Sequence, residues 1–108
     1  MGMPKYLVEV SYSTDGVRGL MKEGGSSRVE MVDKMMANLG GTLESMHFAF
    51  GSGDAYVIAE LPENSDMAAL AMTVGATGAA SLKTTVLMSP EEVDAASQKS
   101  VDYRAPGA

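Results

Sequence analysis

Cysteine is missing from this 108-residue chain. Its absence excludes disulfide bonds, thiolate metal sites, iron–sulfur clusters and cysteine nucleophiles. Long apolar runs are lacking as well, since no window approaches the about 18 apolar residues that a membrane span needs. No charged segment followed by an apolar stretch marks a signal peptide. We therefore expect a cytoplasmic protein of bacterial type that does not enter a membrane.

Positive charge is scarce, with 8 Lys and Arg against 14 Asp and Glu and a formal net charge of −6. The basic residues are scattered, whereas phosphate-backbone binding needs a basic patch, so nucleic acid is not an expected partner. Apolar residues are plentiful at 45% and indicate a globular domain. We interpret the ten methionines as core filler, with an adaptable pocket or a subunit interface as the alternative.

The length fits one domain. Residues 1–3 read as an expression scar and start, because Met1-Gly2 precedes a second Met-Pro. We assign 4–98 to the single domain and 99–108 to a C-terminal tail, either loose or strapped across a partner subunit.

Hydrophobic periodicity predicts four strands and four helices. Strands are expected over 5–12, 42–50, 55–61 and 82–88, and helices over 15–23, from Ser26 or Ser27 to 39, over 67–74, and from Pro90 onward. The order of the main elements is β-α-β-β-α-β, the ferredoxin-like α+β arrangement with a four-stranded antiparallel sheet. Helices would cover one face of this sheet. The other face would be a large exposed patch, so we expect a homodimer with sheets face to face, a dimeric α/β barrel, or a higher homo-oligomer.

The turn Gly51-Ser52-Gly53-Asp54 stands at the middle of the sequence. A two-residue Ser52-Gly53 loop would pair Gly51 with Asp54, a geometry that requires positive φ and therefore glycine. We expect Asp54 to close this turn through hydrogen bonds to nearby backbone.

Counting outward from that turn places His47, the single histidine, opposite Ile58. Tyr56 and Glu60 would then be its diagonal neighbours. Because the ordinary pKa of histidine lies near neutrality, His47 is the first candidate for acid–base catalysis, with Tyr56 or Glu60 to orient it. The alternative is a structural or interface histidine.

Two carboxylates, Glu9 and Glu60, lie on strand faces that are otherwise mostly apolar. If these carboxylates are buried, they must pair with each other or with a cation such as Lys83. The alternative is that they are exposed at an edge or form a salt bridge between subunits. A metal site from His47, Glu9 and Glu60 fits by ligand type only. One histidine and no cysteine argue against it, so we expect no metal.

A second group of candidates consists of Tyr6, Tyr12 and Arg28, joined by His47. These residues would line a pocket between sheet and helices, where Arg28 would face a carboxylate or phosphate. The alternative is the edge of an ordinary core beside a solvated arginine.

The chain resembles the GYD-domain family of small bacterial proteins, which are related to the dimeric α/β-barrel group. The resemblance spans residues 4–93. It rests on Tyr12 to Gly16, Gly19-Leu20, Arg28, Leu39 to Gly41, Gly51 with Asp54, Glu60 to Pro62, Gly75 and Thr84-Thr85. Gly53 stands where the family has its tyrosine, so the role of that tyrosine is absent or taken over by Tyr56. The family is largely without an assigned activity.

Three functions remain open. The first is small-molecule binding, for an apolar or aromatic ligand, in an apolar pocket between sheet and helices. The second, implied by the related barrels, is a cofactor-independent monooxygenase or isomerase that acts on an aromatic or ketide-like substrate through His47. The third is a structural oligomer without a site, or haem carriage with His47 as axial ligand. We expect no cofactor.

Overall fold

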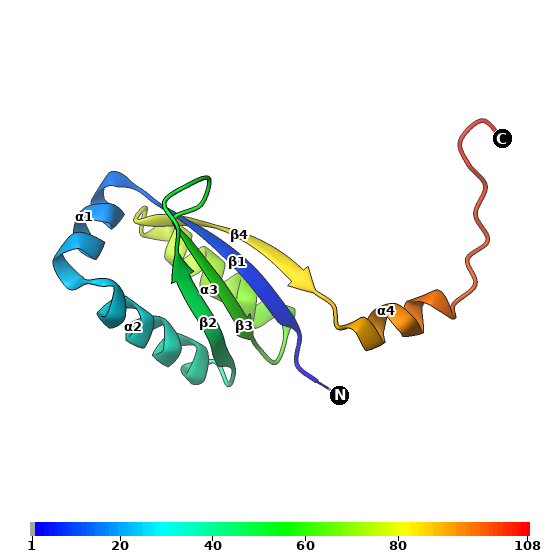
Figure 1. The fold of residues 1–108 in the computed structure, drawn as a ribbon, viewed down its shortest axis with the longest axis horizontal. Helices are drawn as coiled ribbons and strands as arrows, with labels where there is room; N and C mark the ends of the chain where they lie inside the picture. Colours follow the sequence, from blue (N-terminus) through cyan, green and yellow to red (C-terminus); the bar gives the residue numbers. More distant parts are fainter. Residues whose placement is uncertain (1) are drawn as a thin grey trace.

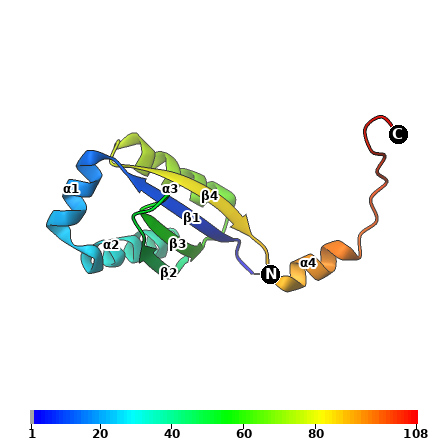
Figure 2. The same cartoon turned by 45° about the horizontal axis from the view of Figure 1, so that its top comes forward.

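Four antiparallel strands form one sheet in the order β2-β3-β1-β4, and helices cover one of its faces (Figures 1 and 2). The structure, a computed structural model, describes residues 2–108. Its elements are β1 (Lys5–Tyr12), α1 (Thr14–Glu23), α2 (Gly25–Asn38), β2 (Thr42–Phe48), β3 (Ala55–Glu60), α3 (Asn64–Ala76), β4 (Ala80–Leu87) and α4 (Pro90–Ser97). This order confirms the predicted ferredoxin-like α+β fold.

The core lies between the sheet and the helices α2 and α3. Alternate residues of the two central strands point into it, so that Tyr6 and Val8 of β1 are buried together with Val57 of β3. Met36 of α2 and Leu70 of α3 close it from the helix side. Every second side chain of the strands packs against the apolar side of the helices, as the hydrophobic periodicity of the sequence predicts.

Helices α1 and α2 are separate because of a glycine. Ser13 caps the start of α1, since its Oγ accepts a hydrogen bond of 3.2 Å from the Gly16 N–H. The helix ends at Gly24, whose φ of 89° suits glycine, and α2 begins at the next residue, Gly25. The predicted separation of the two helices is confirmed, but α2 begins at Gly25 rather than at Ser26 or Ser27, and no side chain of residues 2–108 caps its start.

The predicted register of the β2–β3 hairpin is wrong by two residues. His47 lies opposite Tyr56, not Ile58, and the loop is longer than a two-residue turn because the strands end at Phe48 and restart at Ala55. The cause is a contact with a third strand: the Asp54 N–H donates to the Val10 carbonyl of β1 at 2.8 Å. Asp54 is therefore held by β1 and does not face Gly51.

A bulge at Glu44 interrupts the pairing of β2 with β3. Leu43 lies opposite Ala59 and Ser45 opposite Ile58, so Glu44 is the extra residue. The bulge turns Leu43 toward the helices, where it packs against the core. Without the bulge, strict alternation along β2 would place Leu43 on the same face as His47.

Helix α3 begins at Asn64, one turn before the predicted Met67. The carboxylate of Asp66 accepts a hydrogen bond of 3.0 Å from the Glu63 N–H, which satisfies a donor that would otherwise be free at the helix start. The residues expected to precede the helix thus form its first turn.

The C-terminal arm, residues 88–108, extends away from the rest of the molecule (Figures 1 and 2). Its helix α4 begins at a capping box in which Ser89 and Glu92 exchange hydrogen bonds of 3.1 Å. No residue of α4 is buried, and Val93, Val101 and Tyr103 are exposed. Within residues 2–108, no helix has both the length and the apolar character that crossing a bilayer requires.

Candidate functional site

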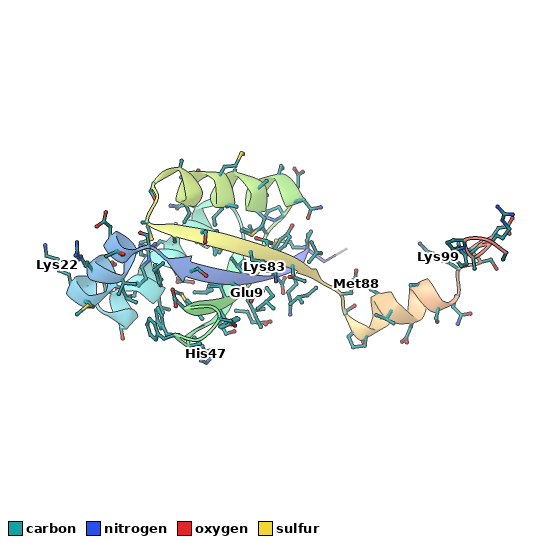
Figure 3. The ribbon with its side chains drawn as sticks, turned by 90° about the horizontal axis from the view of Figure 1, so that it is seen from above. Glu9, Lys22, His47, Lys83, Met88 and Lys99 are labelled. Carbon is teal, nitrogen blue, oxygen red and sulfur yellow. The ribbon has the colours of Figure 1, made fainter. Side chains whose placement is uncertain are left out.

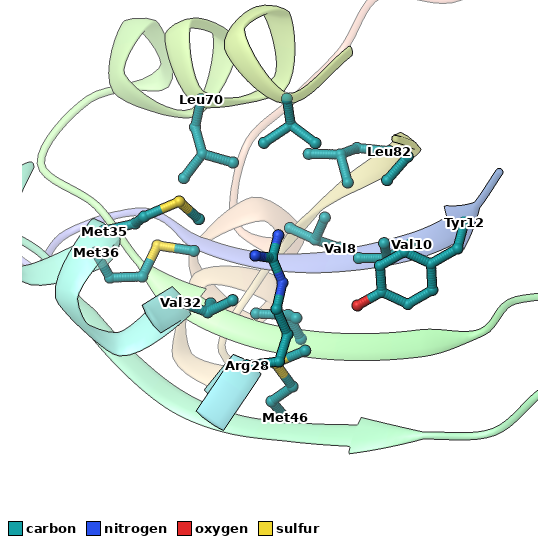
Figure 4. Close-up of a pocket in the computed structure, with 13 residues that line it drawn as sticks. Val8, Val10, Tyr12, Arg28, Val32, Met35, Met36, Met46, Leu70 and Leu82 are labelled. Carbon is teal, nitrogen blue, oxygen red and sulfur yellow. The ribbon is translucent and has the colours of Figure 1, made fainter. Parts of the chain in front are cut away.

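An apolar hollow of about 40 Å³ lies between the sheet and the helices α2 and α3 (Figure 4). Its floor includes Val8 and Val57 from the central strands. Its walls include Met35 and Met36 from α2 and Leu70 from α3. Valine, leucine and methionine side chains make this hollow a place for an apolar group.

A wider outer depression of about 370 Å³ adjoins the hollow at the ends of α1, α2 and α3. The two spaces share the lining residues Tyr12, Arg28, Met35, Val74 and Ala80. These side chains lie at the border between the hollow and the depression. Movement of the longer ones, Arg28 and Met35, would join the two spaces.

Arg28 provides the only positive charge among the residues that line the hollow. Its side chain starts in the first turn of α2 and reaches across the hollow, among Val8, Val10 and Leu70 (Figure 4). One guanidinium nitrogen, Nη1, donates to the Met31 sulfur at 3.6 Å. Among the described residues, no carboxylate forms an ion pair with Arg28.

Tyr12, the last residue of β1, lines both spaces. Its backbone N–H donates to the Asp54 Oδ2 at 2.8 Å, which fixes the end of the strand. Its phenol lies beside Arg28 with the hydroxyl turned toward that side chain (Figure 4). Within residues 2–108, this hydroxyl makes no hydrogen bond.

Tyr6 does not join Tyr12 and Arg28 at the hollow. It is 1% exposed, and its hydroxyl donates to the Asn64 Oδ1 at 2.5 Å. Burial, followed by the charge of Asp66, raises the pKa of the Tyr6 phenol above its ordinary value. This tyrosine joins β1 to the first turn of α3.

His47 lies on the opposite side of the sheet from the hollow, on the face that no helix covers (Figure 3). Its side chain is exposed, and its direct cross-strand neighbour is Tyr56. Glu60 is four residues farther along β3, about 13 Å at the usual strand rise, and lies opposite Thr42. The structure therefore does not assemble the predicted group of His47, Tyr56 and Glu60.

Tyr56 lies over the glycine at the family's tyrosine position. A Cβ atom on Gly53 would lie 3.0 Å from the Tyr56 Oη. The small residue at position 53 leaves room for the Tyr56 ring. Whether Tyr56 takes over the role of the family's tyrosine, or that role is absent, stays a prediction.

The carboxylates of the helix-free face have cations within reach. Glu9 lies 4.0 Å from the Lys83 Nζ, and Glu60 lies 3.8 Å from the Lys5 Nζ. The hydrogen bond of 2.8 Å that the Lys5 Nζ donates to the Glu44 Oε1, and then the charge of that carboxylate, raise the pKa of Lys5. Among residues 2–108 no group of three His, Asp or Glu side chains is placed to hold a metal ion, so His47, Glu9 and Glu60 form no such group.

Met35 and Met46, which line the hollow, are absent from the residues that the sequence points to. The abundance of methionine is a signal, but it does not say which of the ten residues gather in space. Met35 lies on the flank of the predicted apolar stripe of α2, next to Met36, and only the placement of α3 shows that it borders a space.

The fold and the hollow define a small ferredoxin-like α+β domain whose helices enclose an apolar space. The model of the GYD domain family matches residues 6–97, and the chain belongs to this family. Comparison with curated proteins found no match, and comparison with solved structures found none.

Proposed function

We propose that the protein binds a small, largely apolar molecule in the hollow between the sheet and the helices. One observation carries the proposal: Arg28, whose one hydrogen bond in the described structure goes to the Met31 sulfur, and the unbonded hydroxyl of Tyr12 border a space that is otherwise apolar. Ligand sites commonly combine apolar walls with a few polar groups that fix orientation.

Binding requires the hollow to enlarge. A cavity of about 150 Å³ binds benzene, whereas this hollow measures about 40 Å³. Methionine has three rotatable side-chain bonds and adapts its shape at low cost. Displacement of Met35 would merge the hollow with the 370 Å³ outer depression. The combined volume would lie in the lower part of the range of ligand-site volumes, about 300–1,000 Å³.

A neutral fluorescent probe, N-phenyl-1-naphthylamine, tests this proposal. We expect saturable binding with one probe per chain. Val74→Trp, which fills the border between the two spaces, should abolish it, because Val74 lines both. The control is Met72→Trp on the same helix, where the side chain is 69% exposed. Absence of binding, or equal binding by the two variants, would overturn the proposal.

We further propose that a second copy of this chain covers the helix-free face. The face combines half-buried apolar residues, such as Leu7 and Ile58, with charges of both signs. Lys83 and Glu9 lie opposite each other on neighbouring strands, so a copy related by a two-fold axis can offer each charge its complement.

Light scattering during gel filtration tests this association. The native chain is expected to elute as a dimer or a larger oligomer, and Ile58→Lys as a monomer, because a buried unpaired lysine is costly. Met72→Lys, on the exposed side of α3, serves as the control. A monomeric native chain would refute the proposal.

A further inference from the structure

We propose that the ligand of the hollow is a carboxylate with an apolar body, and that Arg28 and Tyr12 hold its carboxyl group. This inference rests on the proposed function and names the class of molecule that the site selects. Its first support is the hydrogen-bonding capacity of Arg28. A guanidinium has five N–H donors, and a thioether sulfur is only a weak acceptor, yet the Met31 sulfur is the one partner of this side chain in the described structure.

The charge of Arg28 is unusual in its setting. The chain carries a net charge of −6, and three of its eight cations, Lys5, Arg18 and Lys83, have a carboxylate within 4.0 Å. The other cations without an ion pair in the described structure are exposed to solvent, with Arg28 as the exception. Arg28 has none in the described structure and lies half-buried against apolar side chains. A planar guanidinium in such a place matches a carboxylate through two parallel hydrogen bonds.

Tyr12 supplies a second donor at the same border. The Asp54 carboxylate fixes the backbone of Tyr12, and the phenol hydroxyl faces Arg28 (Figure 4). A carboxylate offers two oxygens with about four acceptor sites. The Arg28 guanidinium and the Tyr12 hydroxyl can therefore both donate hydrogen bonds to one carboxyl group. The apolar body of the ligand would then enter the hollow in place of Met35.

The acidic rim of the outer depression limits the charge of the ligand. Asp15 and Glu23 line this depression together with Arg28. The nearest compensation for Asp15 is the exposed Arg18, 3.7 Å away. The repulsion between the carboxylates of the rim and an anionic ligand grows with the charge of the ligand. The rim therefore favours a monoanion over a dianion. A carboxylate thus fits better than a phosphate monoester.

Isothermal titration calorimetry with three naphthalene probes tests the assignment: 2-naphthoate, neutral 2-naphthalenemethanol and 2-naphthyl phosphate. All three share one ring system and differ in the charge of the head group. We expect 2-naphthoate to bind at least tenfold more tightly than the alcohol and the phosphate. Arg28→Met should remove this preference while binding of the alcohol persists, and Tyr12→Phe should weaken only the naphthoate.

Two further variants serve as controls. Arg18→Met removes an exposed arginine of α1 that lies outside both spaces, and the preference should persist in it. Arg28→Lys keeps the charge without the planar fork and should retain part of the preference, which also covers the case in which Arg28→Met fails to fold.

The outcomes separate this inference from the proposed function. Equal affinity for the acid and the alcohol, unchanged by Arg28→Met, would overturn the carboxylate assignment and leave the hollow as a site for neutral molecules. Tighter binding of 2-naphthyl phosphate would overturn the preference for a monoanion. Failure of all three probes and of N-phenyl-1-naphthylamine would overturn both proposals.

Discussion

The Asp54 Oδ2 accepts a hydrogen bond of 2.8 Å from the backbone N–H of Tyr12, which joins the β2–β3 loop to the end of β1. The Asp54 N–H donates to the Val10 carbonyl of the same strand at 2.8 Å. One residue of the loop thus completes the hydrogen bonding of β1 at the point where the strand reaches the hollow. The position of Tyr12 depends on this pair of bonds.

Asp54→Ala should lower the free energy of unfolding by about 1.5–3 kcal/mol, the usual worth of a hydrogen bond to a charged group. The variant leaves the Tyr12 N–H without its acceptor. Asp54→Asn keeps an acceptor oxygen, so its free energy of unfolding should fall by less. Urea denaturation followed by circular dichroism measures both, and an Asp54→Ala protein as stable as the native chain would contradict the prediction.

Two glycines of α1 should respond to alanine in opposite directions. A Cβ atom at Gly16 would lie 2.0 Å from the Ala79 carbonyl oxygen, whereas a Cβ atom at Gly19 meets nothing within 4 Å. Gly16→Ala must push two backbone segments apart and should cost about 1–3 kcal/mol or more.

Gly19→Ala should instead stabilise the protein by about 0.5–1 kcal/mol, because alanine favours the helix. Thermal unfolding of the two variants measures the contrast. Stabilisation by both would show that the approach of α1 to Ala79 is looser than in the structure, and destabilisation by both would contradict the prediction at Gly19.

Tyr6 should make the stability depend on pH in the alkaline range. Its pKa is raised above the ordinary 10.0 by burial and by Asp66, so the unfolded chain releases this proton before the folded chain does. Its contribution to stability is therefore complete below about pH 10 and is lost as the pH rises through the folded-state pKa.

Tyr6→Phe should remove that part of the pH dependence. At neutral pH the variant should be less stable by about 1 kcal/mol, since the hydrogen bond to Asn64 is lost. Denaturant midpoints of both proteins between pH 7 and 11 give the difference curve. A constant difference across this range would mean that the Tyr6 pKa is not raised.

His47→Ala should leave probe binding and the stability of the single, dissociated chain nearly unchanged. The side chain is exposed and lies across the sheet from the hollow. Exposed substitutions usually change the free energy of unfolding by less than about 0.5 kcal/mol. Titration with N-phenyl-1-naphthylamine measures probe binding. A large loss of affinity would place His47 in the ligand site after all.

Much of the fold follows from local patterns. The alternation along the strand 5–12 and the separation of the first two helices each depend on a few residues, and the structure confirms them. The register of the hairpin does not follow, because the Asp54 N–H bonds to Val10, far away in sequence. A local turn signal cannot reveal a competing partner on a third strand.

The candidate site was only partly predictable. Arg28 and Tyr12 are expected at one pocket and line the same hollow, because Tyr12 projects from β1 toward the helices and Arg28 projects from α2 toward the sheet. Tyr6, also on that side of β1, is instead enclosed at the other end of the strand by its bond to Asn64. Asn64 is the first residue of α3, and the sequence predicts the start of this helix one turn too late, so the partner of Tyr6 does not follow from the sequence.

The bulge at Glu44 bears on how this sheet resists aggregation. With the strand order β2-β3-β1-β4, β2 and β4 are the two edges. A bulge and charged side chains on an edge strand hinder the addition of another chain, and Glu44 supplies both on β2. Strand β4 pairs with β1 in unbroken register and relies on Lys83 alone for charge. Growth of this sheet into a fibre would therefore start at β4.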